Sequence, residues 1–570
     1  MFLPARAKKA RTGWTTTGTL YQGVTGSVKA FKQASAEYTE AMRVLALALL
    51  ALLVAGCARP EHTRERDHLR IVQTQDFQSL DPIFVSGVGG QELAALMFSY
   101  LVKFDDRGEL VPDAALTVPT RANGGISPDG KTIVYHLRPG IRFSDGSSLT
   151  SFDVAETIGH VAFPGSDAPS RVAFDDVAAI STPDDLTVKV YLRKPYAPIV
   201  LYLCGPGNAI PIMSAAMLQG HAHLRGTRLD SEPLGSGPYK LERWLRGQRV
   251  ELRANPYYFA GKAKIDRITI LPVPSSVTAY AMLRAGEVDA YVNADDSQYT
   301  QLSALPGKRT ESVPIDGTGA LIYNTTHDGL GDVRVRRAFT QALDIPAIVA
   351  KTLLGADRAK NPGRGLFEWA YDPVAYAMPA HDVSAAAKLL DASGWRMGSD
   401  GVRRKHGDPL ALDLILRADK PSALAMATLM QAQVRPLGIR LSLRRFSVET
   451  LVAPNGPLYG GHYDIALFPF IAGFDPDVRD QFACRRVPPH GFNKSRYCNP
   501  ALDRVMNLAV RPYSREERIP YYREVQRTLA RDLPIAVMFQ AVSINTFPAD
   551  LRNERSAVNT PFWNVADWSF

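Results

Sequence analysis

The stretch "TIVYHLRPGIRFSDGSSLTSFDVAETIGHV", residues 132–161, carries the pattern that decides the fold class. Residues 132–137 are rich in β-branched and aromatic side chains and predict a strand, and the Ser-Asp-Gly run at 144–146 predicts a turn. Thr150 is followed three residues later by Asp153, which is typical of an N-cap and its acidic partner at a helix start. A strand that leads through a turn into a helix favours an α/β fold.

Two further blocks show the same alternation. "PLGSGPYKLERWLRGQRVELRANPYYF", residues 233–259, combines a Gly/Pro turn with two predicted strands around a basic hairpin. "DVRVRRAFTQALDIPAIVAKTLLG", residues 332–355, predicts a helix capped by Asp332, with Gly355 near the end of its continuation. The apolar positions of this helix share one face and are Val335, Ala338, Phe339 and Ala342.

A chain of 570 residues is too long for one ordinary hydrophobic core and predicts two or three packed units. The formal net charge is +9, but residues 1–41 carry six Lys or Arg against two Glu, and Arg43 adds another positive charge. About +4 therefore remains for the chain after Cys57. Because no run of Lys and Arg with interleaved aromatic residues is present, the sequence does not indicate nucleic-acid binding.

The main apolar stretch is "VLALALLALLVA", residues 44–55, with Arg43 before it and Gly-Cys after it. Twelve apolar residues are too few for a hydrocarbon core that needs roughly 20. A cation, a short apolar region and small residues at its end are instead typical of a secretory signal. The final "LVAGC" resembles the bacterial lipobox, so we expect a signal peptide at 42–56, lipid on Cys57 and a lipid-anchored linker at 57–67. The alternative is a buried core helix.

Residues 1–41 stand in front of this predicted signal. They are rich in Lys, Arg, Thr and Gly and show no clear apolar period, which gives no reason to expect a folded unit. We therefore expect a disordered upstream extension that is not native to the protein, with translation starting at Met42.

The predicted export of the protein from the cytoplasm decides how its cysteines are interpreted. The two cysteines that bound "CRRVPPHGFNKSRYC", Cys484 and Cys498, are candidates for metal ligands, a redox pair or a disulfide. An oxidising compartment favours the disulfide, and the sequence lacks the close C-x2-C pairs of common zinc sites. With Cys57 assigned to lipid, Cys204 is left over and is expected to be an inert buried thiol. We expect no metal and no cofactor.

The sequence has no G-x-S-x-G, H-E-x-x-H, phosphate-binding G-x-x-x-x-G-K-[ST] or G-x-G-x-x-G motif, which are common catalytic and nucleotide-binding signatures. His221 and His223 could bind a metal, but an exposed loop pair is the favoured interpretation. The two carboxylates of "FDPD", residues 474–477, have no nucleophile or base motif nearby. A turn or a ligand-facing loop is therefore favoured over catalysis there.

Six blocks in this order resemble the family 5 extracytoplasmic solute-binding proteins, which include the oligopeptide-, dipeptide- and nickel-binding lipoproteins of ABC importers. The resemblance covers about residues 70–550. Its most specific parts are "SLDP" at 79–82, "DGKTIVYHLRPGIRFSDGSSLTSFDV" at 129–154, "PLGSGPYKLERW" at 233–244, "NPYYFAGKAKIDRITI" at 255–270, "YNTTHDGLGDVRVRRAFTQALD" at 323–344 and "GFNKSRYCNPALDRVM" at 491–506.

The resemblance implies a two-lobed periplasmic binding protein-like fold of type II, of α/β class, with an extra subdomain inserted in the first lobe. Solute would lie between the lobes and be enclosed when they close about a hinge. The expected boundaries are 68–100, 232–312 and 541–570 for lobe I, 101–231 for the inserted subdomain, and 313–540 for lobe II.

In peptide-binding relatives the loop that corresponds to residues 484–498 borders the ligand cleft and is often bridged by cysteines. The resemblance therefore implies a disulfide that holds a cleft loop in shape and lowers the entropy lost on binding. Dipeptide- and oligopeptide-binding relatives commonly have an acidic residue just after the first cysteine, which pairs with the peptide amino group. Here Arg485 and Arg486 follow, and a guanidinium cannot accept a hydrogen bond from an ammonium group.

Three interpretations of this departure stay open. A carboxylate comes from Asp475, Asp477 or Asp480; or the ligand offers an anionic or neutral group that suits arginine; or both arginines face solvent. By the same resemblance, Arg364 is a second candidate for a ligand carboxylate, and Phe474 is a candidate for packing against ligand side chains.

The resemblance implies a monomeric lipoprotein that delivers a peptide or peptide-like solute to an ABC permease, contacts the membrane through its lipid anchor and does no chemistry. One alternative is an anionic non-peptide solute or a metal chelate, indicated by the two arginines. An alternative of another class is an exported peptidase or amidase, against which the missing catalytic motifs speak.

Overall fold

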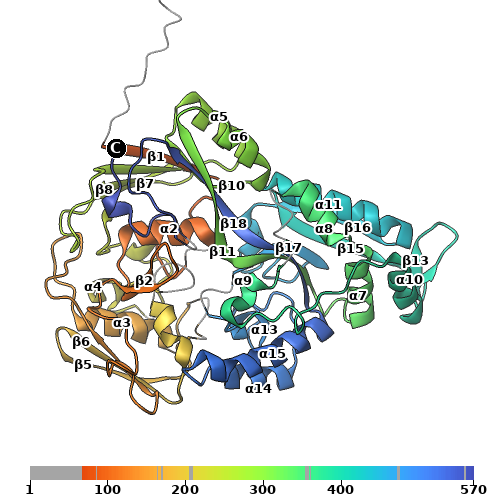
Figure 1. The fold of residues 1–570 in the computed structure, drawn as a ribbon, viewed down its shortest axis with the longest axis horizontal. Coiled ribbons are helices and arrows are strands. Elements are labelled where there is room, and N and C mark those ends of the chain that lie inside the picture. Colours follow the sequence, from red (N-terminus) through yellow and green to blue (C-terminus); the bar gives the residue numbers. More distant parts are fainter. Residues whose placement is uncertain are drawn as a thin grey trace, which may run out of the picture. The chain divides into compact units, whose positions relative to one another are not determined.

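A mixed sheet of ten strands runs through the described part of the computed structural model (Figure 1). The structure describes residues 67–570 except 85–86, 164, 169–170, 172, 204–209, 222, 354–358, 360, 472–474 and 558–559. The expectations for residues 1–66, among them lipid on Cys57, and those for Cys204, Gly355 and Phe474 lie outside these residues. The described residues all belong to one compact unit.

The order of strands in the sheet differs from their order in the sequence, so the chain crosses the sheet repeatedly. Parallel pairs join β1 to β9 and β10, and β15 to β16 and β17, whereas the central strands are antiparallel. From one edge to the other the strands are β16 (Arg440–Phe446), β15 (Ala411–Arg417), β17 (Ile465–Ile471), β11 (Lys308–Tyr323), β18 (Ile535–Pro548), β10 (Ala290–Ala294), β1 (His68–Gln73), β9 (Arg267–Pro272), β8 (Arg249–Ala254) and β7 (Tyr239–Leu245).

The two longest strands, β11 and β18, pair with each other and connect the two halves of the sheet. Their register shifts in the middle: Pro314 pairs with Val542, but the next pair is Thr318 with Gln540. Here β11 has more residues than β18, which is a bulge that bends the ribbon. The expected lobe boundaries at 312 and 540 fall inside these strands and stay a prediction.

We call the half with β1 and β7–β10 the first lobe. Its helices are α2 (Gly87–Met97), α5 (Ser276–Ala285) and α6 (Tyr299–Ser303). The predicted hairpin is confirmed as β7 and β8. The turn before it needs glycine, because a Cβ on Gly235 would lie 2.0 Å from the carbonyl oxygen of Met97. This close approach fixes the end of α2 against the sheet.

The inserted subdomain, at the lower left of Figure 1, has its own core. The predicted strand at 132–137 and the helix after Thr150 are confirmed, and the backbone N–H of Thr150 donates to Asp153 Oδ2 at 2.8 Å. Its elements are β2 (Val102–Phe104), β3 (Leu110–Pro112), β4 (Thr132–His136), α3 (Ser151–Ala162), β5 (Val177–Asp184), β6 (Thr187–Leu192), the 3-10 helix η1 (Ala197–Leu203) and α4 (Ala215–Leu218).

The second lobe packs helices against β15–β17. The predicted helix and its buried face are confirmed in α7 (Val333–Ala342), where Asp332 accepts a hydrogen bond from the backbone N–H of Arg334 at 2.8 Å. The other elements are α8 (Ile345–Thr352), α9 (Arg364–Phe367), α10 (Val383–Ala392), β12 (Arg396–Met397), β13 (Arg403–Lys405), β14 (Asp408–Pro409), α11 (Pro421–Val434), α12 (Val448–Val452), α13 (Arg479–Phe482), α14 (Pro500–Ala509) and α15 (Arg515–Asp532). Among the described helices, none combines the length and apolar character that a membrane crossing requires.

Candidate functional site

A pocket with a volume of about 160 Å³ lies where the crossing strands pass between the lobes. Its walls come from the first lobe, from the second lobe and from both crossing strands. The residues used below are Thr74, Asn293 and Ala294 of the first lobe, Arg417, Lys420, Ser422, Met426 and Phe468 of the second lobe, and Ile315 and Phe539 of the crossing strands.

One side of the pocket carries charge at the carboxyl end of β15. Arg417 holds Asp419 in two hydrogen bonds, with Nε to Oδ1 at 3.0 Å and Nη2 to Oδ2 at 2.5 Å. Burial opposes the charge of Asp419, but the neighbouring Arg417 outweighs it and lowers the pKa of Asp419 to about 2. Thr74 Oγ1 of the first lobe also donates to Asp419 Oδ2, at 3.2 Å. The ionised carboxylate thus connects the two lobes.

The start of α11 forms a second polar connection between the lobes. Lys420 Nζ donates to the carbonyl oxygens of Asn293 at 3.0 Å and Ala294 at 3.2 Å. Asn293 has a φ of 55°, in the left-handed region where non-glycine residues are uncommon. This conformation coincides with a register irregularity between β10 and β18. The unusual backbone therefore belongs to the segment that receives Lys420.

Behind Asn293 lies a buried carboxyl group. Asn293 Nδ2 donates to Glu92 Oε2 at 2.7 Å, and Glu92 is 1% exposed. No described atom forms a hydrogen bond with Glu92 Oε1. Burial raises the pKa of Glu92 to about 8, because a charge without a cationic partner is costly away from water. Glu92 is therefore protonated at neutral pH.

Much of the remaining wall is apolar, although Gln73, Gln75 and Asp296 also line the pocket. Ile315, Met426, Phe468 and Phe539 contribute large apolar side chains to its walls. An apolar hollow with a few fixed polar groups can hold an organic solute and orient it through those groups. Within the described residues, no group of three or more His, Cys, Asp or Glu side chains is placed to hold a metal ion.

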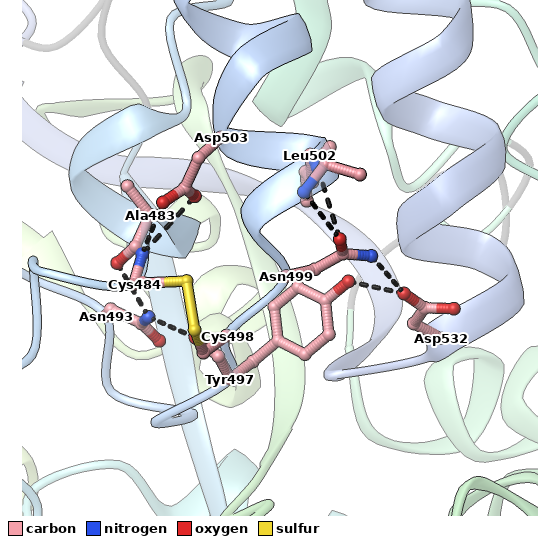
Figure 2. The surroundings of a disulfide bond; sticks show 10 residues. Ala483, Cys484, Asn493, Tyr497, Cys498, Asn499, Leu502, Asp503 and Asp532 are labelled. Atoms are coloured by element: carbon pink, nitrogen blue, oxygen red, sulfur yellow. Dashed lines mark hydrogen bonds between the residues drawn. A yellow bond between two sulfur atoms is a disulfide. The ribbon is translucent and has the colours of Figure 1, made fainter.

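The loop between the cysteines is closed by a disulfide from Cys484 to Cys498 (Figure 2). The fully buried Asn493 donates from its side-chain amide to the carbonyl oxygens of Ala483 at 3.0 Å and Tyr497 at 2.7 Å. Outside the loop, Asn499 donates to Asp532 at the end of α15, at 3.0 Å. The backbone N–H of Cys484 reaches Asp503 in α14 at 3.3 Å. The loop is therefore fixed to both helices.

The predicted arginines lie elsewhere than the pocket. Arg485 is exposed, and Arg486 forms an ion pair with Asp175 of the inserted subdomain. Arg364 is exposed at the first position of α9. Solute contact by Arg364, Arg485 or Arg486 stays a prediction, and the structure gives Arg486 a protein partner.

The predicted carboxylates of the "FDPD" segment are both buried in ion pairs. Asp475 accepts two hydrogen bonds from Arg518, at 2.6 and 2.8 Å. Asp477 accepts from Arg479 Nη2 at 2.7 Å and from Tyr196 at 2.9 Å. Although burial alone would raise its pKa, Arg479 holds the pKa of Asp477 below its ordinary value. This geometry favours a structural role for both, and their contact with solute stays a prediction.

Sequence reasoning missed Arg417, Lys420, Asn293 and Glu92. A signal for the first two was present, because "LDLIL" at 412–416, which is apolar except for Asp413, is followed at once by "RADKP". Charged residues at the carboxyl end of a parallel strand are placed to meet a ligand. Asn293 and Glu92 carry no such signal. His221 and His223 are both exposed.

Residues 109–482 match the family described as bacterial extracellular solute-binding proteins, family 5 middle. This match covers more than half of the chain. The chain belongs to this family of solute-binding proteins. The expected family is thereby confirmed, and the two-lobed fold of type II is confirmed by solved structures.

The family 5 chain is similar over most of its length to Protein XP55 of Streptomyces lividans, with 27% identity over 80% of each chain. It is 23% identical to the oligopeptide-binding protein AppA of Bacillus subtilis, over 84% of this chain and 87% of AppA. AppA solved with a nonapeptide superimposes with a TM-score of 0.79, over 88% of this chain and 98% of AppA. NikZ of Campylobacter jejuni, solved in complex with Ni(L-His), superimposes with a TM-score of 0.80 at 23% identity, over 89% of this chain and all of NikZ.

Proposed function

We propose that this solute-binding protein captures a peptide or peptide-like solute in the pocket between its lobes and delivers it to the permease of an ABC importer. The observation that carries the proposal is the position of the pocket, with walls from both lobes and from the strands that connect them. A solute there is enclosed by rotation of the lobes. AppA, which has the same fold, was solved with a nonapeptide.

The peptide class fits the chemistry of the pocket walls. Apolar side chains such as Phe468 and Phe539 suit peptide side chains, and Lys420 and Arg417 suit carbonyl or carboxylate oxygens. Within this proposal the solute is bound without being transformed, and the protein acts as a monomer outside the cytoplasm, anchored through lipid on Cys57.

Native mass spectrometry of the protein purified without refolding tests this directly. A heterogeneous set of short peptides released on denaturation is expected. A matched variant, Ala423→Phe, fills the pocket from a residue that is 9% exposed in its wall, and it is expected to abolish peptide retention. Retention of the same peptides by Ala423→Phe would move the binding site elsewhere.

A second candidate solute is an anionic non-peptide compound or a metal chelate. Two cations in the pocket wall, Arg417 and Lys420, favour it, and NikZ was solved with Ni(L-His). A single anionic species in the released material, bound more than tenfold less tightly by Arg417→Ala, would support this candidate. Unchanged affinity of every bound anion in Arg417→Ala and Lys420→Ala would exclude it.

A further inference from the structure

The inserted subdomain touches the second lobe at a place separate from the crossing strands. The backbone N–H of Ala197 donates to the carbonyl oxygen of Val510 at 2.9 Å. Val510 follows α14 in the second lobe, yet its fully buried side chain packs within the core of the inserted subdomain. Tyr513 continues the contact by donating from its hydroxyl group to Gly130 at 3.0 Å.

Charged pairs flank this apolar contact. Arg511 Nη1 lies 2.5 Å from Asp176 Oδ2 and 3.0 Å from the carbonyl oxygen of Pro195. Arg486, inside the disulfide-closed loop, pairs with Asp175. The two neighbouring aspartates of the inserted subdomain thus each meet one arginine of the second lobe. The partners are 311 and 335 residues apart in sequence.

A third pair in this contact is fully buried. The Tyr196 hydroxyl donates to Asp477 Oδ2 at 2.9 Å, and the guanidinium of Arg479 lies 4.8 Å from the centre of the Tyr196 ring. Tyr196 is 1% exposed and Asp477 is 2% exposed. If the two sides separated, Asp477 would lose a hydrogen bond that partly compensates its burial, which is costly for a charged group.

We propose that these contacts form a latch that holds the two lobes closed: Asp175, Asp176 and Tyr196 on the inserted subdomain, and Asp477, Arg486 and Arg511 on the second lobe. Within the described part of the chain, the backbone passes between the lobes only through β11 and β18. Every latch contact is noncovalent and breaks when the lobes rotate apart. Resting on the proposed function, the latch residues are positioning residues that slow solute release without touching solute.

The latch also assigns a structural role to the disulfide. Cys484 and Cys498 close the loop that carries Arg486, and Cys484 is hydrogen-bonded to Asp503 of α14, the helix that leads to Arg511. The covalent link therefore closes the loop that carries Arg486, and the Cys484 hydrogen bond connects this loop to the helix that leads to Arg511. Arg485 is next in sequence to Arg486 but is exposed and, among the described residues, forms no ion pair.

Hydrogen exchange of the solute-free full chain tests the latch. The amide of Ala197 in the inserted subdomain reports on it, because this amide donates to the carbonyl oxygen of Val510 in the second lobe. In Arg486→Ala/Arg511→Ala, exchange at Ala197 is expected to accelerate about tenfold or more, because local opening is favoured when charged hydrogen bonds are removed. Amides of β6 in the same subdomain are expected to keep their wild-type rates. Arg485→Ala, which removes one positive charge from the same loop as Arg486, is expected to match wild type.

A charge-exchange variant distinguishes the loss of the latch from misfolding of the protein. Arg486→Asp combined with Asp175→Arg is expected to restore the Ala197 rate that Arg486→Asp alone has raised. Unchanged exchange at Ala197 in the double alanine variant would overturn the latch, because the contact would then be a permanent interface. Equal acceleration in β6 and at Ala197 would also overturn it, because the substitutions would then loosen the whole subdomain. Because no solute is present, a failure of the protein to bind peptides leaves this result intact.

Discussion

Ser422 donates a hydrogen bond of 2.7 Å to the fully buried carboxylate of Asp295. Ser422 lies in the first turn of α11 in the second lobe, and Asp295 follows β10 in the first lobe. Together with the Lys420 contacts it places the start of α11 directly on the first lobe. The pocket therefore has a fixed polar side at the point where the lobes meet.

Replacement of Ser422 by alanine is expected to lower the free energy of unfolding by about 1–3 kcal/mol, because Asp295 loses one donor while staying buried. Thr428→Ala, on the exposed side of the same helix, is the matched control and is expected to change stability by less than about 0.5 kcal/mol. Urea unfolding followed by circular dichroism measures both. Equal effects of the two substitutions would argue against a special role for the Asp295 contact.

Glu92 predicts a dependence of stability on pH. The folded protein keeps this proton up to a pKa of about 8, whereas the unfolded chain loses it near 4.5. The folded state binds more protons between these values, so the contribution of Glu92 to stability falls as pH rises from 4.5 and is lost above 8. Glu92→Gln removes this dependence, because the amide cannot ionise.

The Glu92→Gln variant is therefore expected to equal wild type near pH 4.5 and to exceed it near pH 9. The difference is on the order of a few kcal/mol, since each unit of pKa shift corresponds to about 1.4 kcal/mol. Thermal unfolding across this pH range checks the expectation, with the exposed Glu287→Gln as control. Parallel curves for Glu92→Gln and wild type would show that Glu92 ionises normally.

Removal of the disulfide is expected to destabilise the protein through the unfolded state. Cys484 and Cys498 are 14 positions apart, and closing a loop of this size stabilises by about 3 kcal/mol in the chain-entropy model. The double variant Cys484→Ser/Cys498→Ser should show this loss in denaturant unfolding, and wild type in reductant should approach the same midpoint. Equal unfolding midpoints of oxidised wild type and the double variant would contradict this stabilising role of the disulfide.

Gly365 is expected to tolerate no side chain. A Cβ there would lie 2.0 Å from the carbonyl oxygen of Gly317 in β11, so Gly365→Ala forces α9 away from the crossing strand. Overpacking of this kind costs about 1–3 kcal/mol. Gly159→Ala in α3 is expected to be neutral or stabilising by up to about 1 kcal/mol, because an added Cβ there meets nothing within 4 Å apart from its chain neighbours and the backbone of its own helix. Thermal unfolding of both variants distinguishes the two sites.

Local signals in the sequence predicted local structure well. The cap at Asp332, the buried face of α7 and the hairpin of β7 and β8 depend on residues close together in the chain. Strand β11 was not predicted, because "PIDGTG" within it is typical of a loop and is accommodated here by the register shift against β18. Long-range pairing, which the sequence does not display, decided that segment.

The site was harder to predict than the fold. The disulfide loop was expected to border solute, which stays a prediction. Its Arg486 pairs with Asp175, which is 311 residues away in the sequence. The "FDPD" carboxylates looked available in the sequence, yet Arg518 and Arg479 bind them in the structure. The Arg486 pair joins the inserted subdomain to the second lobe, and Asp475 and Arg518 are 43 residues apart within the second lobe, so local spacing could not reveal either pair. Arg479 stands only two residues after Asp477, and here the residue types alone did not show that the pair is buried.

The bulge between β11 and β18 has a mechanical consequence. Between the pair Pro314–Val542 and the pair Thr318–Gln540, strand β11 has three residues, 315–317, whereas β18 has one, Ala541. A bulge of this kind bends the strand and increases its local twist, and a second register shift follows between Gly319 and Ala320. The sheet can therefore act as a torsional joint, and the work of swinging the lobes is set by the surfaces that meet rather than by the backbone that joins them.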